Sequence, residues 1–501
     1  MSWLVPVPVV LPLIGAALAV LVGRSRAAQR VISCVILTVT LVVSVVILVE
    51  VDSNGAMVAH SGGWPAPLGI SLVADRLSAI LLVLASTMLL AVLIYAIGEP
   101  GAERNHVGFQ SAYLVLAAGV SASFLTGDLF NLFVAFEVML TASYVLLTLG
   151  GRAEQIRSGM TYIVISLVAS SLFITALALI YAATGTVNMA HIAERMADLP
   201  LGITSAFALL LIVVFGIKAA LFPLFFWLPD SYPIAPSPIT AVFAGLLTKV
   251  GIYAIIRTQT LFFPPESQHG TLLLVVAALT MAVGVLGAIA QDDVKRILSF
   301  HIVSQIGYMV MGLGLFTLAG ITGAIFYIVH HIVVKTTLFL VGGLIEHAGG
   351  SSRLTRVGGM VRTAPALAVL FLIPALSLAG IPPFSGFLAK LALVDAGLGA
   401  SEWAVVAVSL VVSLLTLFSM MKIWAGVFWN PVEDHSDDEY DAPPLPVGRL
   451  GGPPFMVLPT AALVVCSLAI SVGAGPLYDL AERAASDLLH PAAYIDQVLR
   501  P

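Results

Sequence analysis

Long apolar stretches recur along nearly the whole chain, and they constrain its fold more than any other feature. A helix needs about 20 apolar residues to cross the hydrocarbon core of a bilayer. Strands of a membrane barrel would instead alternate apolar and polar residues. Of the 501 residues, 59% are hydrophobic and only 10% are charged, whereas soluble domains carry about 25% charged residues. The sequence therefore predicts an all-α polytopic membrane protein.

The apolar stretches predict 14 transmembrane helices. The first stretch has no basic segment before it and no small-residue cleavage site after it, so we expect it to stay in place rather than to act as a signal peptide. The predicted spans lie at 3–23, 31–50, 75–98, 109–126, 129–150, 160–183, 204–228, 237–257, 271–290, 297–318, 321–345, 364–396, 403–429 and 456–476.

The cations of the loops predict the orientation of the chain. Loops after odd-numbered spans carry 12 Lys or Arg residues, whereas the other loops and the C-terminal tail together carry five. Cytoplasmic loops are enriched in these two residues. We therefore expect a multi-pass protein of the bacterial plasma membrane with both termini outside.

Several classes of protein are excluded. A net charge of −5 and the lack of a Lys/Arg-rich run exclude a basic nucleic-acid binder. The two cysteines, Cys34 and Cys466, both fall in apolar spans and form no CxxC pair, which excludes a disulfide framework. The chain has neither a GxGxxG nor a GxxxxGK[ST] motif. We expect no nucleotide site, no metal and no cofactor.

Lysine and arginine are distributed differently. Four of the six lysines lie inside apolar spans, Lys422 lies near the end of one, and Lys295 lies in a polar loop, whereas no arginine lies at the centre of a span. Ionisable residues inside a membrane are costly, and they mark ion or proton paths. The sequence predicts a proton relay of Glu137, Lys218, Lys249, His331, Lys335 and Lys390.

Lysine suits such a relay because its charge can change. Burial favours the neutral amine, and a nearby carboxylate favours the ammonium form. Arginine stays charged in proteins. Simpler interpretations remain: Glu137 and Lys218 would form a static ion pair, and Lys249 and Lys422 would extend to the interface.

Three histidines lie in the apolar spans that carry the buried lysines or next to them. His330 and His331 point about 100° apart on a helix. We favour His331 for the path because it shares a face with Lys335. His330 and His301 are possible accessory residues, and a hydrogen-bonded core position is the commoner role for His301.

Proline residues predict breaks in the seventh and twelfth spans. Pro223 and Pro229 follow Lys218, and Pro382 and Pro383 precede Lys390. Broken backbone is tolerated in membranes only where it is buried in protein or lines a wet cavity. Transporter sites are often built from such breaks in corresponding positions of two repeats. The breaks lie five spans apart, which predicts two inverted five-helix repeats, spans 4–8 and 9–13.

This organisation divides the chain into five parts, which include an acidic segment and an amphipathic C-terminal segment. The acidic segment, Glu433–Asp441, is predicted to be a solvated cytoplasmic connector. The last segment carries a helical face of Leu477, Leu480, Ala481, Ala484 and Leu488, which predicts an amphipathic helix on the outer membrane surface or against a neighbouring subunit. The parts are an N-terminal three-helix segment (1–108), a first inverted repeat (109–257), a second inverted repeat (271–429), an acidic cytoplasmic loop (430–455), and a last transmembrane helix with the outer-surface helix (456–501).

Four stretches carry a resemblance to a known family: DLFNLFVAFEVMLTASYVLL, KAALFPLFFWLPDSYPIAPSPITAVFAGLLTKVGIYAIIRT, DDVKRILSFHIVSQIGYMVMG and LSLAGIPPFSGFLAKLAL. The chain resembles the antiporter-like membrane subunits shared by respiratory complex I and Mrp-type multisubunit sodium/proton antiporters. It is most similar to the D subunits of the Mrp antiporters. Tyr232, where complex I subunits would carry histidine, points to the Mrp side.

The resemblance implies a role for each relay residue. Glu137 would pair with Lys218 where the proton route begins, and Lys249 would be the central relay residue. His331 and Lys335 would continue the path, and Lys390 would be its terminal site. The resemblance also implies 14 helices in two inverted repeats.

It further implies a complex with other antiporter subunits that exchanges sodium for protons across the bilayer. The sequence does not locate a sodium site, for which Asp128, Asp230 and the carbonyls of the broken helices are candidates. Three alternatives stay open: a proton-pumping subunit of an NADH:quinone oxidoreductase-type complex, a haem-bearing cytochrome using His301, His330 or His331, and an assembly scaffold.

Overall fold

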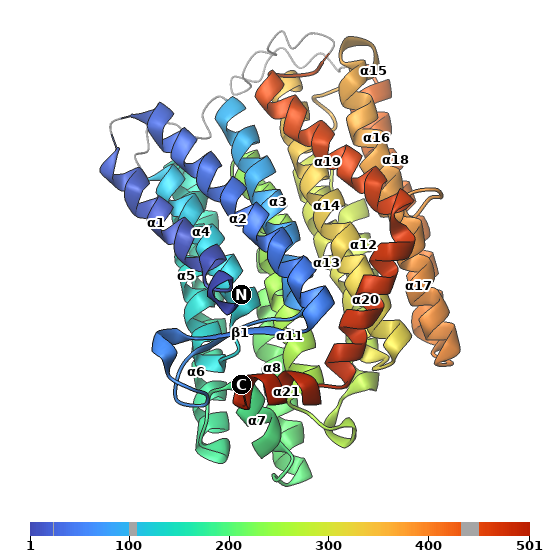
Figure 1. Ribbon diagram of the computed structural model, residues 1–501. Coiled ribbons are helices and arrows are strands. Elements are labelled where there is room, and N and C mark those ends of the chain that lie inside the picture. The colour runs from blue at the N-terminus through green and yellow to red at the C-terminus, as the bar shows by residue number, and fades with distance from the viewer. Residues whose placement is uncertain (24, 100–107, 432–449, 501) are drawn as a thin grey trace.

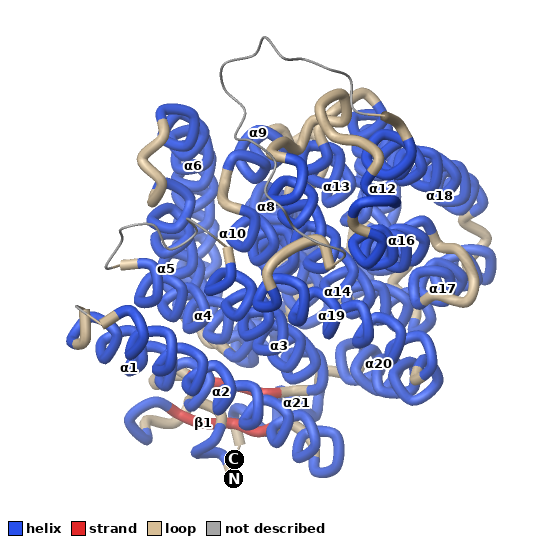
Figure 2. The backbone as a smooth tube through the Cα atoms, turned by 90° about the horizontal axis from the view of Figure 1, so that it is seen from above, coloured by secondary structure: helices blue, strands red, loops and turns tan. Residues whose placement is uncertain are grey.

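The computed structural model describes residues 1–23, 25–99, 108–431 and 450–500. Helices stand side by side in a bundle, with most of them roughly parallel to one long direction (Figure 1). Both termini lie at the same edge of the bundle, near α1, α2 and β1 (Figure 2). The acidic segment Glu433–Asp441 lies outside the described residues.

Within the described residues, 12 helices are long and apolar enough to cross a membrane. Three of them include short neighbouring segments: η1 (Ser2–Leu4), the π-helical turn η4 (Phe243–Leu247) and the π-helical turn η6 (Ala425–Trp429). Their helices are α1 (Val7–Leu21), α2 (Arg26–Asn54), α3 (Arg76–Gly98), α5 (Leu129–Thr148), α6 (Ala153–Thr184), α8 (Leu201–Ala219), α10 (Ser237–Val242) continuing into α11 (Thr248–Leu261), α12 (Gly270–Ile289), α13 (Val294–Gly314), α14 (Leu318–Gly349), α18 (Trp403–Trp424) and α19 (Pro454–Val472).

Shorter elements complete the chain. Two of them, α4 and α16, are apolar helices below the length of a full span. The prediction of an all-α chain missed one small feature, an antiparallel hairpin between α2 and α3 in which Met57 pairs with Ala74. The shorter elements are β1 (Met57–His60), η2 (Ser61–Gly63), β2 (Ser71–Ala74), α4 (Phe109–Leu125), α7 (Met189–Met196), α9 (Trp227–Ser231), η3 (Tyr232–Ile234), η5 (Pro265–Ser267), α15 (Met360–Thr363), α16 (Pro365–Ala379), α17 (Ser385–Gly399), α20 (Ala474–Leu489) and α21 (Ala492–Leu499).

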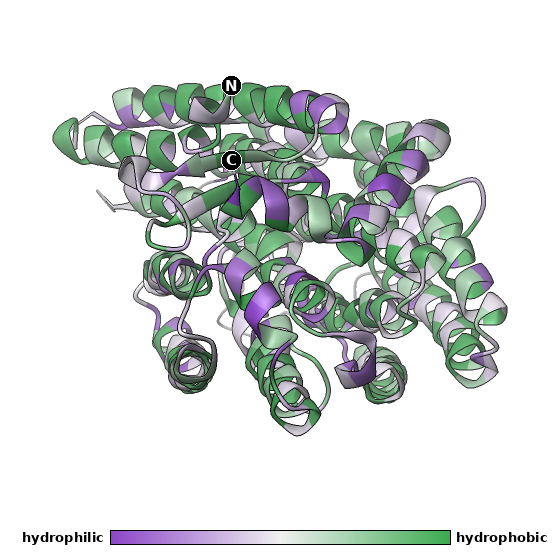
Figure 3. Cartoon of the chain, turned by 60° about the horizontal axis from the view of Figure 1, so that its bottom comes forward, coloured by the Kyte–Doolittle hydropathy of each residue, from purple (hydrophilic) through white to green (hydrophobic). Residues whose placement is uncertain are grey.

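Hydrophobic residues cover the outer faces of the bundle, and hydrophilic residues gather mostly in loops and at helix ends (Figure 3). Outward-facing apolar side chains such as Val42 and Leu414 are exposed. At the centre, α14 is buried along its membrane-spanning window. An exposed apolar exterior around a buried core is what a bilayer solvent requires.

Two helices end where the prolines predict a break. The first, α8, ends at Ala219, and Pro223 lies in the turn that follows; α16 ends at Ala379, before Pro382 and Pro383. The span predicted at 204–228 is therefore too long at its C-terminal end. Pro229 does not lie in the break between α8 and α9 but in the first turn of α9. Proline is tolerated there because a first-turn residue needs no backbone donor.

The C-terminal tail packs against its own chain. The small-residue face of α20, with Ala481, Ala484 and Leu488 buried, contacts α3 and α14. Arg76 on α3 pairs with Asp487 at 2.7 Å, and Arg483 pairs with Asp52 at 2.8 Å. The predicted helix exists, but its apolar face is covered by the same chain and not only by a membrane surface or a neighbouring subunit. Periodicity identifies an apolar face without identifying what covers it.

Candidate functional site

Lys218 lies in the last turn of α8, directly before the first break. Its side chain is 8% exposed, and its Nζ donates to the Ser166 carbonyl and the Ser170 hydroxyl, each at 3.3 Å. The Ser170 hydroxyl in turn donates to the Glu137 carboxylate on α5. The described residues give no direct ion pair between Glu137 and Lys218, so Ser170 on α6 bridges them.

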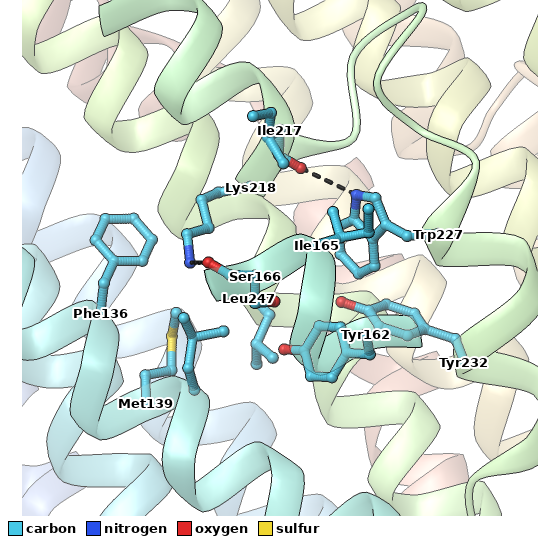
Figure 4. Close-up of a pocket in the computed structure, with 11 residues that line it drawn as sticks. Phe136, Met139, Tyr162, Ile165, Ser166, Ile217, Lys218, Trp227, Tyr232 and Leu247 are labelled. Carbon is cyan, nitrogen blue, oxygen red and sulfur yellow. Dashed lines mark hydrogen bonds between the residues drawn. The ribbon is translucent and has the colours of Figure 1, made fainter. Parts of the chain in front are cut away.

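A small cavity lies beside Lys218 (Figure 4). Its volume of about 20 Å³ is enough for one water molecule. The rings of Tyr162 and Tyr232 and the apolar side chains of Met139 and Leu247 line it with Lys218. Tyr232 is 1% exposed, and its hydroxyl has no hydrogen-bond partner in the described part of the chain. The cavity therefore offers a water molecule the Lys218 amino group and the Tyr232 hydroxyl as polar partners.

Lys249 is the second residue of α11, which follows the π-helical turn η4. It is fully buried, and its Nζ donates to the Ala244 carbonyl at 2.5 Å and to the Thr248 hydroxyl at 3.2 Å. A π-turn leaves carbonyls without their usual i→i+4 partner. The Ala244 carbonyl thus becomes available to the lysine five residues later. This position is inconsistent with the interpretation that Lys249 extends to the membrane interface.

His331 and Lys335 lie on one face of α14, the helix at the centre of the bundle. Among the described residues, both ring nitrogens of His331 lack a hydrogen-bond partner, and so does the Nζ of Lys335. Lys335 lies 5.8 Å from the Phe339 ring centroid. The neighbours that interact electrostatically with His331 include Lys249 and Lys335. The structure packs α14 against α10 and η4, the segments that directly precede the start of α11, where Lys249 lies.

The other two histidines have defined partners. The Nδ1 of His330 lies 2.8 Å from the Ser385 hydroxyl at the start of α17, and the Nε2 of His301 lies 2.9 Å from the Ser419 hydroxyl. Both histidines are fully buried. His330 connects α14 to the second break, while His301 takes the hydrogen-bonded core position that is usual for a buried histidine.

Lys390 is bound to the second break itself. Its Nζ donates to the carbonyls of Leu378 and Ala379 at 3.0 Å each and to the Ser413 hydroxyl at 2.8 Å. The two carbonyls end α16, where no further turn uses them. The negative end of the α16 dipole also favours a cation there. The Nζ lies 5.1 Å from the Tyr308 ring centroid.

Three polar residues considered from the sequence have structural roles. Asp128 caps α5 by accepting from the Asn131 amide at 2.7 Å. Burial raises the pKa of Asp128 to about 6, against the lowering effect of backbone hydrogen bonds. Asp230 is exposed and pairs with Arg296 at 3.0 Å. Lys422 pairs with Asp292 at 2.7 Å, which holds the end of α18 near the α12–α13 turn.

Sequence reasoning missed one charged group. Lys295, expected in a polar loop, is 5% exposed in the first turn of α13 and forms an ion pair with Glu346 on α14. Glu99, at the C-terminal end of α3, belongs to the same neighbourhood. The signal available in the sequence was an acidic residue directly after each of two long apolar stretches, Glu99 and Glu346.

Comparisons with known proteins identify the family. Residues 126–416 match the family model described as NADH:quinone oxidoreductase/Mrp antiporter, transmembrane. The D subunit of the Na(+)/H(+) antiporter from Alkalihalophilus pseudofirmus is 46% identical over 503 residues, which cover 100% of both chains.

Two solved structures have the same fold across their whole length. A chain of the Mrp complex from Dietzia sp. DQ12-45-1b aligns with a TM-score of 0.91 at 35% identity, and a chain of an archaeal membrane-bound sulfane sulfur reductase aligns with a TM-score of 0.90 at 26% identity. Both alignments cover 100% of each chain. With its two broken helices and its buried row of lysines, this chain belongs to the NADH:quinone oxidoreductase/Mrp antiporter family of membrane subunits.

Proposed function

We propose that this chain is the D subunit of an Mrp-type multisubunit Na⁺/H⁺ antiporter and that it moves protons along its buried lysine row. The full-length similarity to the D subunit of a Na(+)/H(+) antiporter and to a chain of an Mrp complex supports the assignment. It is a secondary transporter subunit rather than an enzyme, and its partners are the other subunits of the complex.

The observation that carries the proton route is the placement of its lysines. Lys218 and Lys390 each lie beside a helix break, and Lys249 and Lys335 lie fully buried between those breaks. Each of the first two donates hydrogen bonds to backbone carbonyls. Such charges are costly in a membrane, and where they occur they mark ion or proton paths. The proposed sequence of proton carriers is Glu137, Lys218, Lys249, Lys335 with His331, and Lys390.

The proposal includes a membrane topology. If α4 and the broken pair α16–α17 also cross the bilayer, the 12 long helices become 14 spans. The repeats would then be residues 109–257 and 271–429, following the segment 1–108 and preceding the loop 430–455 and the region 456–501. The distribution of the loop cations supports an orientation with both termini outside.

Replacing Lys218 tests the proposed function. We expect Lys218→Ala, in the assembled complex, to abolish sodium-dependent proton exchange in everted membrane vesicles, because the route loses its titrating group beside the first break. Lys422→Ala removes a lysine outside the row and is the matched control. Wild-type exchange by an assembled Lys218→Ala complex would rule out this route.

A second candidate is a proton-pumping subunit of a redox complex. The similarity to a chain of an archaeal respiratory membrane complex favours it. The neighbouring genes separate the two: small membrane subunits without redox centres indicate an antiporter, whereas quinone-binding or iron–sulfur subunits indicate a redox pump.

A further inference from the structure

A second group of charges lies at one end of the bundle, away from the lysine row. It contains Glu99 at the end of α3, Lys295 at the start of α13 and Glu346 near the end of α14. Lys295 forms an ion pair with Glu346, and Ser237 at the start of α10 donates to the same carboxylate at 3.3 Å. We call these three charged residues the α3–α14 charge cluster.

The cluster holds one more carboxylate than it can neutralise. The Oε2 atom of Glu99 is buried and has no hydrogen-bond partner among the residues that the structure describes. Burial raises the pKa of Glu99 to about 7; the Lys295 ammonium opposes this rise, and the Glu346 carboxylate adds to it. An uncompensated buried carboxylate is strongly disfavoured unless it takes up a proton.

Among the residues that the structure describes, the other neighbours of Glu99 contribute little charge. Tyr95, one turn earlier on α3, donates to the Leu340 carbonyl at 3.0 Å. Phe455 and Met456 of α19 pack against Gly98. Arg152 acts on Glu346. Within this part of the chain, Lys295 acts on both acids and Arg152 acts on Glu346 alone, so one proton would neutralise Glu99.

One helix, α14, carries residues of both the cluster and the lysine row. Glu346 follows Lys335 by 11 residues, which places the two on one helix face about 16 Å apart along the axis. Small residues bring α14 close to its neighbours over this distance. A Cβ atom added at Gly343 would clash with the Tyr95 hydroxyl, and one added at Gly245 would clash with the Thr336 hydroxyl.

We propose that the α3–α14 charge cluster is a proton-exchange site that connects the lysine row to the cytoplasm. Its end of the bundle is the one whose loops carry most of the cations, which the positive-inside rule places in the cytoplasm. The inference rests on the proposed function, because it needs a proton route within the chain.

The proton balance is simple. During sodium export, an ammonium at Lys335 gives up one proton towards the cytoplasmic end, and the cluster takes up one proton. The amine of Lys335 is then neutral, and Glu99 is a carboxylic acid. Glu99 afterwards releases the proton to the cytoplasm and becomes a carboxylate again. A group exchanges protons best when its pKa is close to the pH on the side that it serves.

The test replaces Glu99 by glutamine, which has the same shape and cannot titrate. In everted vesicles the cytoplasmic face meets the medium, so sodium-dependent proton exchange in the native complex should rise as the medium passes about pH 7 and Glu99 can release its proton. We expect Glu99→Gln to lower exchange by about tenfold or more and to remove that rise. Glu99→Asp should keep a rise at a shifted pH.

Glu154→Gln is the matched control, because Glu154 is an exposed acid on α6. An assembled Glu99→Gln complex with the native rate and pH profile would overturn the proposal, as would an unchanged profile with a weakened response to Na⁺, which would assign the cluster to sodium. If Glu99→Gln fails to assemble, Glu99→Asp becomes the test. A rise in exchange at a shifted pH supports the proposal, and a rise at the native pH overturns it. A fully active Lys218→Ala complex would instead reject the proton route itself.

Discussion

At the residue scale, the buried lysines differ in how the backbone stabilises their charge. Lys249 uses a carbonyl released by a π-turn, and Lys390 uses two carbonyls at the end of α16. Lys218 relies on α6. Lys335 has no hydrogen-bond partner within the described residues, so an ammonium there needs water as its partner. The row therefore contains positions with and without protein acceptors.

Ser170 offers a test of the bridge between Glu137 and Lys218. Ser170→Ala removes the hydroxyl that contacts both groups, while the cavity beside Lys218 stays intact. We expect the exchange rate to fall by about tenfold, because a charge-assisted hydrogen bond contributes about 1.5–3 kcal/mol. The measurement is sodium-dependent proton exchange in everted vesicles.

The neighbouring Ser171 is the control for this substitution. Its hydroxyl bonds the Leu167 carbonyl of its own helix, so Ser171→Ala should leave exchange unchanged. Equal rates for both serine variants would show that Ser170 does not couple the two charges.

At the scale of elements, close packing around the second break positions Lys390 and His330. A Cβ atom added at Gly386 would overlap the Ser377 carbonyl oxygen and lie 2.9 Å from the Cε1 of His330. Glycine at 386 thus lets α17 approach both α16 and α14. Steric contact, rather than a hydrogen bond alone, holds the broken helix in place.

Replacing Gly386 by alanine should separate these helices. Overpacking typically costs about 1–3 kcal/mol, so we expect Gly386→Ala to lower the melting temperature of the purified complex and its exchange rate. Gly399→Ala, on the same helix, meets nothing within 4 Å and should leave both unchanged. A Gly386→Ala complex with native stability and exchange would show that the close approach is dispensable.

At the scale of the whole molecule, the C-terminal tail and the N-terminal helices close the end of the bundle opposite the α3–α14 charge cluster. Arg257 of α11 is buried against Asp75, with Nη2 and Oδ2 2.5 Å apart. The Tyr494 ring of α21 lies 5.2 Å from the guanidinium. This arrangement covers α11 two turns beyond Lys249. The same end is held by the more exposed Asp52, Arg76 and Asp487 ion pairs.

The buried Asp75–Arg257 pair should contribute more to the stability of the fold than the exposed ion pairs at this end. Asp75→Asn keeps the helix-capping ability of the side chain but leaves Arg257 as an unpaired buried charge, which costs about 3–5 kcal/mol. Asp487→Asn breaks a pair whose acid is 42% exposed and should cost about 1 kcal/mol or less. Thermal unfolding of the purified complex measures both, and equal losses would contradict the assigned roles.

Much of this protein could be predicted from the sequence because membrane insertion is governed by local composition. Each apolar stretch needs only its own length and its flanking charges to specify a span. Proline removes a backbone donor and favours a break, although α1, α16 and α19 each continue through an internal proline. The predicted positions of most spans therefore agree with the long helices, and Lys218 and Lys390 could be placed beside breaks.

Contacts between distant segments were decided by the tertiary structure alone. The ion pair of Lys295 with Glu346, the Ser170 bridge and the docking of α20 on α3 and α14 each join residues that sequence spacing does not relate. The sequence by itself determined which groups are buried in an apolar background, because hydrophobicity is a property of each segment. Which of those groups touch was decided by packing, because close approach depends on small residues and helix irregularities supplied by other parts of the chain.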